Sequence, residues 1–124
     1  MKSIIFFFIF LPVALLAQSQ TPPPPTDSLF IITYTTGPAW DKSKNPGDQP
    51  WFKEHSANLG KMRKDGIIKL GARHGEKGMI VLSVASREAA ANLVFNDPAV
   101  VNKLFNAELE KLSVFYFGCL EKPK

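Results

Sequence analysis

The sequence predicts one small α+β domain, in which a four-stranded antiparallel sheet carries two helices on one face. Segments rich in β-branched and aromatic residues recur along the chain, helical apolar patterns lie between them, and Gly- or Pro-containing turns separate them. Their order is strand, helix, strand, strand, helix, strand. This is the split βαβ order of the ferredoxin-like fold.

The first two elements are predicted from their composition and their end signals. Residues 29–36 are rich in β-branched and aromatic side chains and end at a Gly-Pro pair, which indicates a strand. After a long loop, we expect a helix with Asp48 as its N-cap and Pro50 in its first turn. Apolar side chains then recur at helical spacing until Gly66, which is expected to end the helix.

The second half of the domain is expected to contain a β-hairpin, a second helix and a last strand. Residues 67–74 and 79–84 flank a short Gly-containing turn, which predicts an antiparallel hairpin. Ser86 is the expected N-cap of a second helix that continues to Phe95. Residues 112–117 are mostly apolar and aromatic, and we expect them to form the last strand.

The predicted strands suggest how the protein assembles. Both alternating sets of side chains are apolar in residues 79–84 and in residues 112–117. Because helices can cover only one face of a sheet, the other face would expose a large apolar surface, which small monomers rarely do. We therefore expect a homodimer whose two sheets pack against each other.

The first 19 residues are predicted to be a secretory signal peptide, since Lys2 precedes an apolar run at residues 4–17 and small residues follow. The run is shorter than the ~20 apolar residues that a membrane helix needs. Cleavage after Ser19 fits the small-residue rule better than cleavage after Ala17. We expect a periplasmic or secreted protein that leaves the membrane after cleavage; a retained N-terminal anchor is the alternative.

The remaining chain divides into a Pro-rich linker at residues 20–28, a domain at residues 29–120 and a tail at residues 121–124. Consecutive prolines make the linker stiff and extended, so we interpret it as a spacer. A ligand for a proline-recognition domain is the alternative.

Charge and cysteine content exclude some classes of protein. Of the 15 basic side chains, Lys2 lies in the predicted signal peptide, which leaves 14 against 11 acidic ones and a net charge of +3. Basic and acidic side chains are interspersed along the sequence, whereas nucleic-acid binders carry one-sided basic patches, so no nucleic-acid partner is expected. The single cysteine, Cys119, excludes an intrachain disulfide; it is interpreted as an inert thiol or one that pairs between chains.

His55 and Asp97 form the candidate acid/base pair. His55 lies on the apolar stripe of the first predicted helix, where a neutral imidazole could act as a general base or could be a hydrogen-bonded core residue. Asp97 precedes Pro98, which is typical of an N-cap with proline at the first helical position. A capping carboxylate can also orient an imidazole, so the two roles are compatible.

Arg73 and Trp40 are candidate ligand-binding residues. Arg73 alternates to the opposite face from His74, and on the inner face it would hold a carboxylate or phosphate; a salt bridge at the rim is the alternative. Trp40 lies in the long loop before the first helix, where a lid would lie, although it could simply pack against the helix end. We expect no metal site and no cofactor, because no ligand spacing or cofactor fingerprint is present.

The order and spacing of these motifs resemble the YCII-related family of the dimeric α+β barrel group over residues 29–117. The chain is similar to this family in its first-helix His55, in a glycine after the second strand, Gly71, in an alanine-rich second helix and in Asp97-Pro98. It differs after Gly71, where the family usually has proline. The resemblance implies a dimeric α+β barrel in which His55 and Asp97 correspond to the family's proposed active-site pair.

Two functions remain open from the sequence. In the first, the protein is a small exported enzyme that uses His55, oriented by Asp97, for acid/base chemistry on a small polar or anionic molecule. In the second, the same pocket is a non-catalytic ligand-binding or assembly module.

Overall fold

The computed structural model describes residues 27–118. The predicted signal peptide, most of the predicted linker and Cys119 lie outside this range. No helix between residues 27 and 118 is long and apolar enough to cross a membrane.

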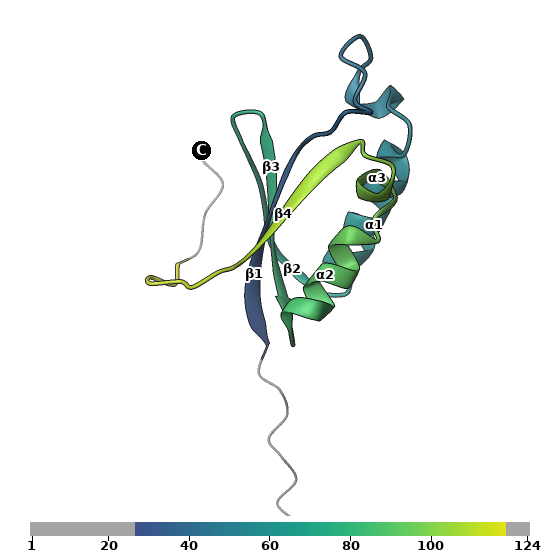
Figure 1. Ribbon diagram of the computed structural model, residues 1–124. Helices are drawn as coiled ribbons and strands as arrows, with labels where there is room; N and C mark the ends of the chain where they lie inside the picture. The colour runs from purple at the N-terminus through teal and green to yellow at the C-terminus, as the bar shows by residue number, and fades with distance from the viewer. Residues whose placement is uncertain (1–26, 119–124) are drawn as a thin grey trace, which may run out of the picture.

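The described chain is an α+β domain with two layers, a sheet and a layer of helices that covers one of its faces (Figure 1). The sheet is antiparallel and four-stranded, with the strand order β2-β3-β1-β4. Its strands are β1 (Ser28–Thr36), β2 (Ile68–His74), β3 (Lys77–Val84) and β4 (Phe105–Lys111). The helices are α1 (Phe52–Lys64), α2 (Arg87–Phe95) and the short α3 (Pro98–Val101), with a 3-10 turn η1 (Pro46–Asp48) before α1. The predicted α+β class and four-stranded antiparallel sheet are confirmed, and the arrangement is compatible with a ferredoxin-like fold.

The core lies between the sheet and the helices. In β1, alternate side chains point to the helices and are almost fully buried, as the two-residue period of a strand requires: Phe30, Ile32 and Tyr34. They pack beside Ile80 and Leu82 of β3, which pair with Ile32 and Phe30 in the antiparallel ladder. Helix α2 closes this core with Ala90 and Val94, one helical turn apart on its buried side.

The prediction that residues 112–117 form the last strand was wrong. The fourth strand is β4, which lies earlier in the chain and pairs with β1 from Thr36–Phe105 to Phe30–Lys111. Only one face of β4 touches the core, so its apolar side chains alternate with polar and charged ones. This half-buried pattern is a weaker hydrophobic signal than the apolar run that follows it, and the sequence pattern therefore favoured the wrong segment.

The start of the first helix was also predicted wrongly, whereas its end was correct. Asp48 ends the 3-10 turn, and the N-cap of α1 is Trp51, which has a left-handed backbone with φ of 68°. Residues 49 and 50 belong to the loop between them, and the Gln49 side chain makes hydrogen bonds within that loop. Gly66 follows the helix with φ of 75°, the conformation expected of a glycine that ends a helix.

The hairpin and the second helix were predicted correctly, except that β3 begins at Lys77, two residues before the predicted strand. β2 and β3 are joined by a two-residue turn whose first residue, Gly75, has φ of 54°. The Ser86 side chain accepts a hydrogen bond from the Ala89 backbone N–H and so caps α2. Asp97 caps α3, with Pro98 at its first position.

Candidate active site

The structure brings His55 and Asp97 together, although they are 42 residues apart in the sequence. The His55 Nδ1–H donates to Asp97 Oδ1 at 2.9 Å. His55 comes from the first turn of α1, and Asp97 comes from the bend between α2 and α3. Both are buried, with 6% of His55 and 1% of Asp97 exposed. Since Nδ1 is engaged by the carboxylate, Nε2 is the ring nitrogen left to meet a ligand.

Three donors converge on the Asp97 carboxylate. Besides His55, the Asn58 amide donates to Oδ2 at 2.6 Å, and the Ala99 backbone N–H donates to Oδ1 at 3.0 Å. Burial raises the pKa of Asp97, but the hydrogen bonds from His55 and Asn58, together with the Ala99 N–H, lower it by more. The pKa of Asp97 is therefore below its usual range, and the group is a buried carboxylate that both caps α3 and orients the imidazole.

Tyr34 lies against this pair. Its ring meets the His55 ring edge to face, with centroids 5.3 Å apart. Burial and the nearby Asp97 charge raise the pKa of Tyr34, so its hydroxyl stays protonated. That hydroxyl is buried and has no hydrogen-bond partner among the residues that the structure describes. An unpaired buried hydroxyl is energetically unfavourable. The Tyr34 hydroxyl is therefore free to hydrogen-bond a ligand next to His55 and Asp97.

His55 and Tyr34 line a pocket of about 410 Å³ between α1, the β1–α1 loop and one end of the sheet. This volume is in the range of small-molecule sites. The candidate ligand-binding residues Trp40 and Arg73 line the same pocket, whereas Asp97 lies behind His55 and does not. The remaining wall is mostly apolar or aromatic and includes Phe52, Leu59, Met79, Ile80 and Phe105.

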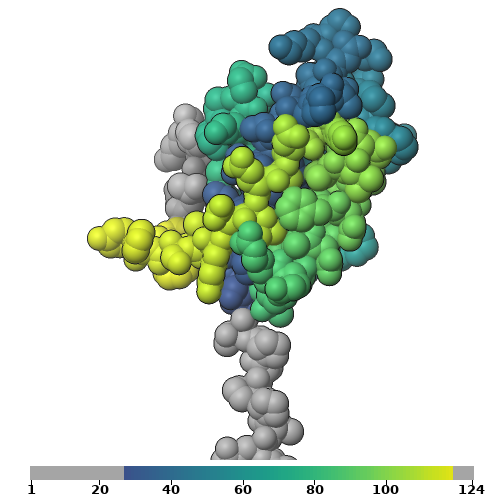
Figure 2. Space-filling model, viewed as in Figure 1, coloured from purple at the N-terminus to yellow at the C-terminus, as the bar shows by residue number. Residues whose placement is uncertain are grey.

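The loop that carries Trp40 is held in place by a residue that the sequence did not single out. Gln49 is 4% exposed, and its amide accepts from the Asp41 backbone N–H at 3.0 Å and donates to the Asp41 carbonyl at 2.6 Å. The same amide nitrogen donates to the Lys44 carbonyl at 3.3 Å. Figure 2 shows this loop projecting at one end of the molecule. Trp40 packs on Phe105, with ring centroids 5.6 Å apart, and so forms one side of the pocket mouth.

Arg73 points to the helix side of the sheet. It pairs with Gly78, which pairs in turn with the inward-facing Tyr34, so all three positions share that face. His74 is exposed and lies on the opposite face, as alternation along the strand requires. The sequence had left the direction of Arg73 open, and only the register of β2 on β3 decides it. Between residues 27 and 118, Arg73 takes part in no salt bridge.

Sequence reasoning missed Asn58, Tyr34, Gln49 and Phe105. Asn58 follows His55 by three residues, and this spacing places both side chains on one face of a helix. That spacing was the one local signal that could have identified it. The other three reach the site through long-range packing, which has no local pattern.

No three His, Cys, Asp or Glu side chains gather in the described part of the chain in a way that could hold a metal ion. No protein-family model matches this chain, and no curated protein matches it. The resemblance to the YCII-related family stays a prediction based on the order and spacing of residues.

Proposed function

We propose that the protein is a small exported enzyme of the YCII-related type, which uses His55 and Asp97 for acid/base chemistry on a small polar or anionic molecule. One observation carries this proposal: a buried carboxylate holds Nδ1 of a histidine whose ring lines an open pocket. A histidine that served only the core would instead be surrounded by packed side chains on every side.

The proton transfer follows from the hydrogen bonds. Asp97 keeps the Nδ1 proton in place, which leaves the Nε2 lone pair of the neutral ring as the base. When Nε2 takes a proton from the substrate, the ring becomes an imidazolium, and the adjacent carboxylate stabilises that charge. The low pKa of Asp97 means that the carboxylate stays ionised during this step. The imidazolium then returns the proton to the product.

Arg73 and Trp40 bind the substrate in this proposal. The Arg73 guanidinium, on the inner face of β2, pairs with an anionic or polar group of the molecule. Trp40 covers the pocket mouth from the β1–α1 loop.

The alternative is a pocket that binds a ligand without turnover. The low exposure of His55 favours this alternative, because only a small part of the ring reaches the pocket. The two functions predict different outcomes for the same variants, since only the enzyme needs Nε2 to exchange a proton.

The test begins with native mass spectrometry of the protein as its host produces it, to identify a copurifying small molecule. Turnover and binding of that molecule are then compared in His55→Gln, Asp97→Asn and the double variant, with the exposed His74→Gln as the matched control. If the pair acts as a unit, the double change costs much less than the sum of the single changes, and His74→Gln has no effect. Unchanged turnover in His55→Gln refutes the enzyme, and binding without turnover in the unaltered protein supports the alternative.

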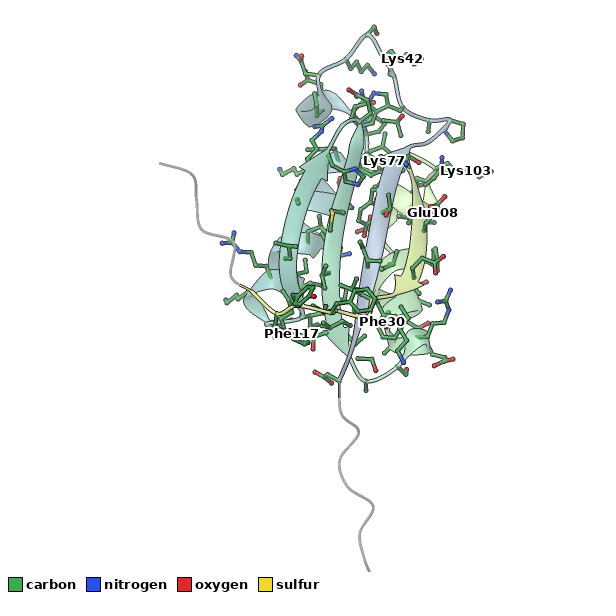
Figure 3. The ribbon with its side chains drawn as sticks, turned by 90° about the vertical axis from the view of Figure 1, so that its left-hand side faces the viewer. Phe30, Lys42, Lys77, Lys103, Glu108 and Phe117 are labelled. Atoms are coloured by element: carbon green, nitrogen blue, oxygen red, sulfur yellow. The ribbon has the colours of Figure 1, made fainter. Side chains whose placement is uncertain are left out.

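We also propose that two copies pair through the face of the sheet that the helices do not cover, to form a dimeric α+β barrel. Figure 3 views this face, with the helices behind it. By the strand register, Ile31, Val81 and Leu70 lie on it. Leu70 is exposed and Ile31 is half-buried, whereas Val81 is only 5% exposed. β4 contributes charged side chains to this face. Phe115, Tyr116 and Phe117 are 91%, 93% and 84% exposed, and the segment that bears them leaves the sheet on this side (Figure 1). Leu70 and the aromatic side chains of residues 115–117 form exposed apolar surface of the kind that marks an interface.

Light scattering of the unaltered protein and of Ile31→Lys tests the dimer. We expect a dimer for the first and monomer or aggregate for the second, because the new charge would lie within the apolar surface. Ser56→Lys is the matched control, since it adds the same charge at an exposed position of α1, on the opposite side of the sheet, and should leave the dimer intact. A stable monomer of the unaltered protein at micromolar concentration refutes the proposal.

A further inference from the structure

Two glycines form part of the pocket floor, and the backbone does not require either of them. Gly71 of β2 and Gly78 of β3 both line the pocket on neighbouring strands. Neither has a positive φ. A Cβ at Gly71 would meet Ile80 at 3.9 Å, and one at Gly78 would meet Tyr34 at 3.9 Å, both ordinary contacts. Glycine is disfavoured inside strands, so its presence at these two positions calls for another reason.

The glycines leave an open floor opposite an aromatic wall. Gly78 lies between Arg73 and Tyr34 in the ladder, and its missing side chain leaves a gap between those two side chains. Across the pocket, Phe105 contacts the rings of Trp40, Phe52 and His55 at centroid distances of 5.6, 6.3 and 5.0 Å. A space bounded by rings on one side and by glycine backbone on the other admits a flat group more readily than a bulky one.

The charges around the pocket limit the ligand further. Arg73 and Glu76 are its oppositely charged lining residues, and the Asp97 carboxylate lies behind His55. One guanidinium matches the planar geometry of a single carboxylate. A dianion such as phosphate would face Arg73 but would also approach two carboxylates, which oppose a second negative charge.

We propose that the pocket binds a flat, ring-bearing monocarboxylate, with its ring over the floor formed by Gly71 and Gly78 and its carboxylate at Arg73. This inference names the substrate class of the proposed function and rests on that function in taking this pocket as the site. The inference concerns ligand binding alone, so a binding experiment tests it independently of whether His55 catalyses a reaction.

Calorimetric titration of the protein, purified as its host produces it, with four probes tests the ligand class. Benzoate has the ring and the charge, cyclohexanecarboxylate has the charge with a puckered ring, benzyl alcohol has the ring without the charge, and inorganic phosphate has charge without a ring. We expect benzoate to bind most tightly, at least about tenfold better than the others, as the loss of one charge-assisted contact implies. Absence of benzoate binding, or equal or tighter binding of any other probe, overturns the proposal.

Variants locate the site and separate binding from folding. Gly78→Leu fills the floor, so it should abolish benzoate binding while its thermal melting temperature stays equal or rises. Gly60→Ala is the matched control, because a Cβ at this exposed helical glycine meets nothing within 4 Å and lies outside this pocket. Arg73→Gln should weaken benzoate binding about tenfold with no change in melting temperature. Unchanged binding in Gly78→Leu or in Arg73→Gln overturns the proposal, and if Gly78→Leu fails to fold, Arg73→Gln alone decides.

Binding and turnover give distinguishable results. Benzoate binding that survives His55→Gln in a protein without turnover supports the ligand class and refutes the enzyme. Turnover of a non-aromatic copurifying molecule, without benzoate binding, supports the enzyme and refutes the ligand class.

Discussion

Replacing Asp97 by alanine should destabilise the domain severely, because three donors converge on this carboxylate. The change removes the hydrogen bonds from His55, Asn58 and Ala99 and leaves their N–H groups without that partner. A buried donor without a partner costs about 1–3 kcal/mol. Because Asn58 is only partly buried and can turn to water, the expected loss is about 3–5 kcal/mol, which is a large part of the ~5–15 kcal/mol of a typical domain.

Asp97→Asn should cost less, because it keeps the shape and one acceptor oxygen. It replaces the other oxygen by an NH2 group that faces a donor, and it removes the charge. We expect a loss of about 1.5–3 kcal/mol, the contribution of a hydrogen bond to a charged group. Asp65→Asn is the matched control: its carboxylate pairs with Lys61 at the surface, and an exposed pair contributes less than about 1 kcal/mol.

The pH dependence of stability gives an independent measurement of the same carboxylate. The folded-state pKa of Asp97 is lower than its unfolded value, so its contribution is present above the unfolded pKa of about 4 and is lost as the pH falls through the folded pKa. Urea unfolding followed by circular dichroism should therefore show a gap between the unaltered protein and Asp97→Asn that is full at neutral pH and shrinks in acid. An Asp97→Ala variant within about 0.5 kcal/mol of the unaltered protein would refute this account of the site.

Three other changes have expected outcomes that unfolding measurements can check. Gly37→Ala should lower the free energy of unfolding by about 1–3 kcal/mol, because a Cβ there would overlap the Lys103 carbonyl oxygen. An unchanged urea midpoint would contradict this. Gln49→Ala should cost about 1–3 kcal/mol through its lost hydrogen bonds to the loop and should shift tryptophan fluorescence, and an unaltered spectrum would show that the loop is held otherwise. Tyr34→Phe should leave stability equal or raise it by about 1 kcal/mol, since it removes an unpaired buried hydroxyl; a large loss would show that the hydroxyl has a partner.

Local chemistry in the sequence was enough to predict the element types and most of their limits. The alternation in residues 28–36, the glycine with positive φ after α1, the tight turn at Gly75 and the Ser86 cap all act within a few residues of themselves. The sequence-based predictions were wrong for two elements, the last strand and the start of the first helix. The half-polar pattern of β4 gave a weaker signal than the more apolar segment that follows it. Asp48 was expected to cap the first helix, but it ends a 3-10 turn, and Trp51 is the N-cap of α1.

The assembly of the site, by contrast, depends on contacts between distant parts of the chain. His55 and Asp97 were identified as candidates from their local contexts, but their contact joins the start of α1 to the bend between α2 and α3 across 42 residues, and no periodicity encodes it. The direction of Arg73 depends on the register of β2 on β3, which a shift of one residue would reverse. The roles of Tyr34 and Phe105 come from packing between β1 and β4, which are far apart in the chain, and Gly78 meets Tyr34 through the long-range pairing of β1 with β3. A local pattern can show which residues are able to do chemistry, but only the folded chain determines which of them meet.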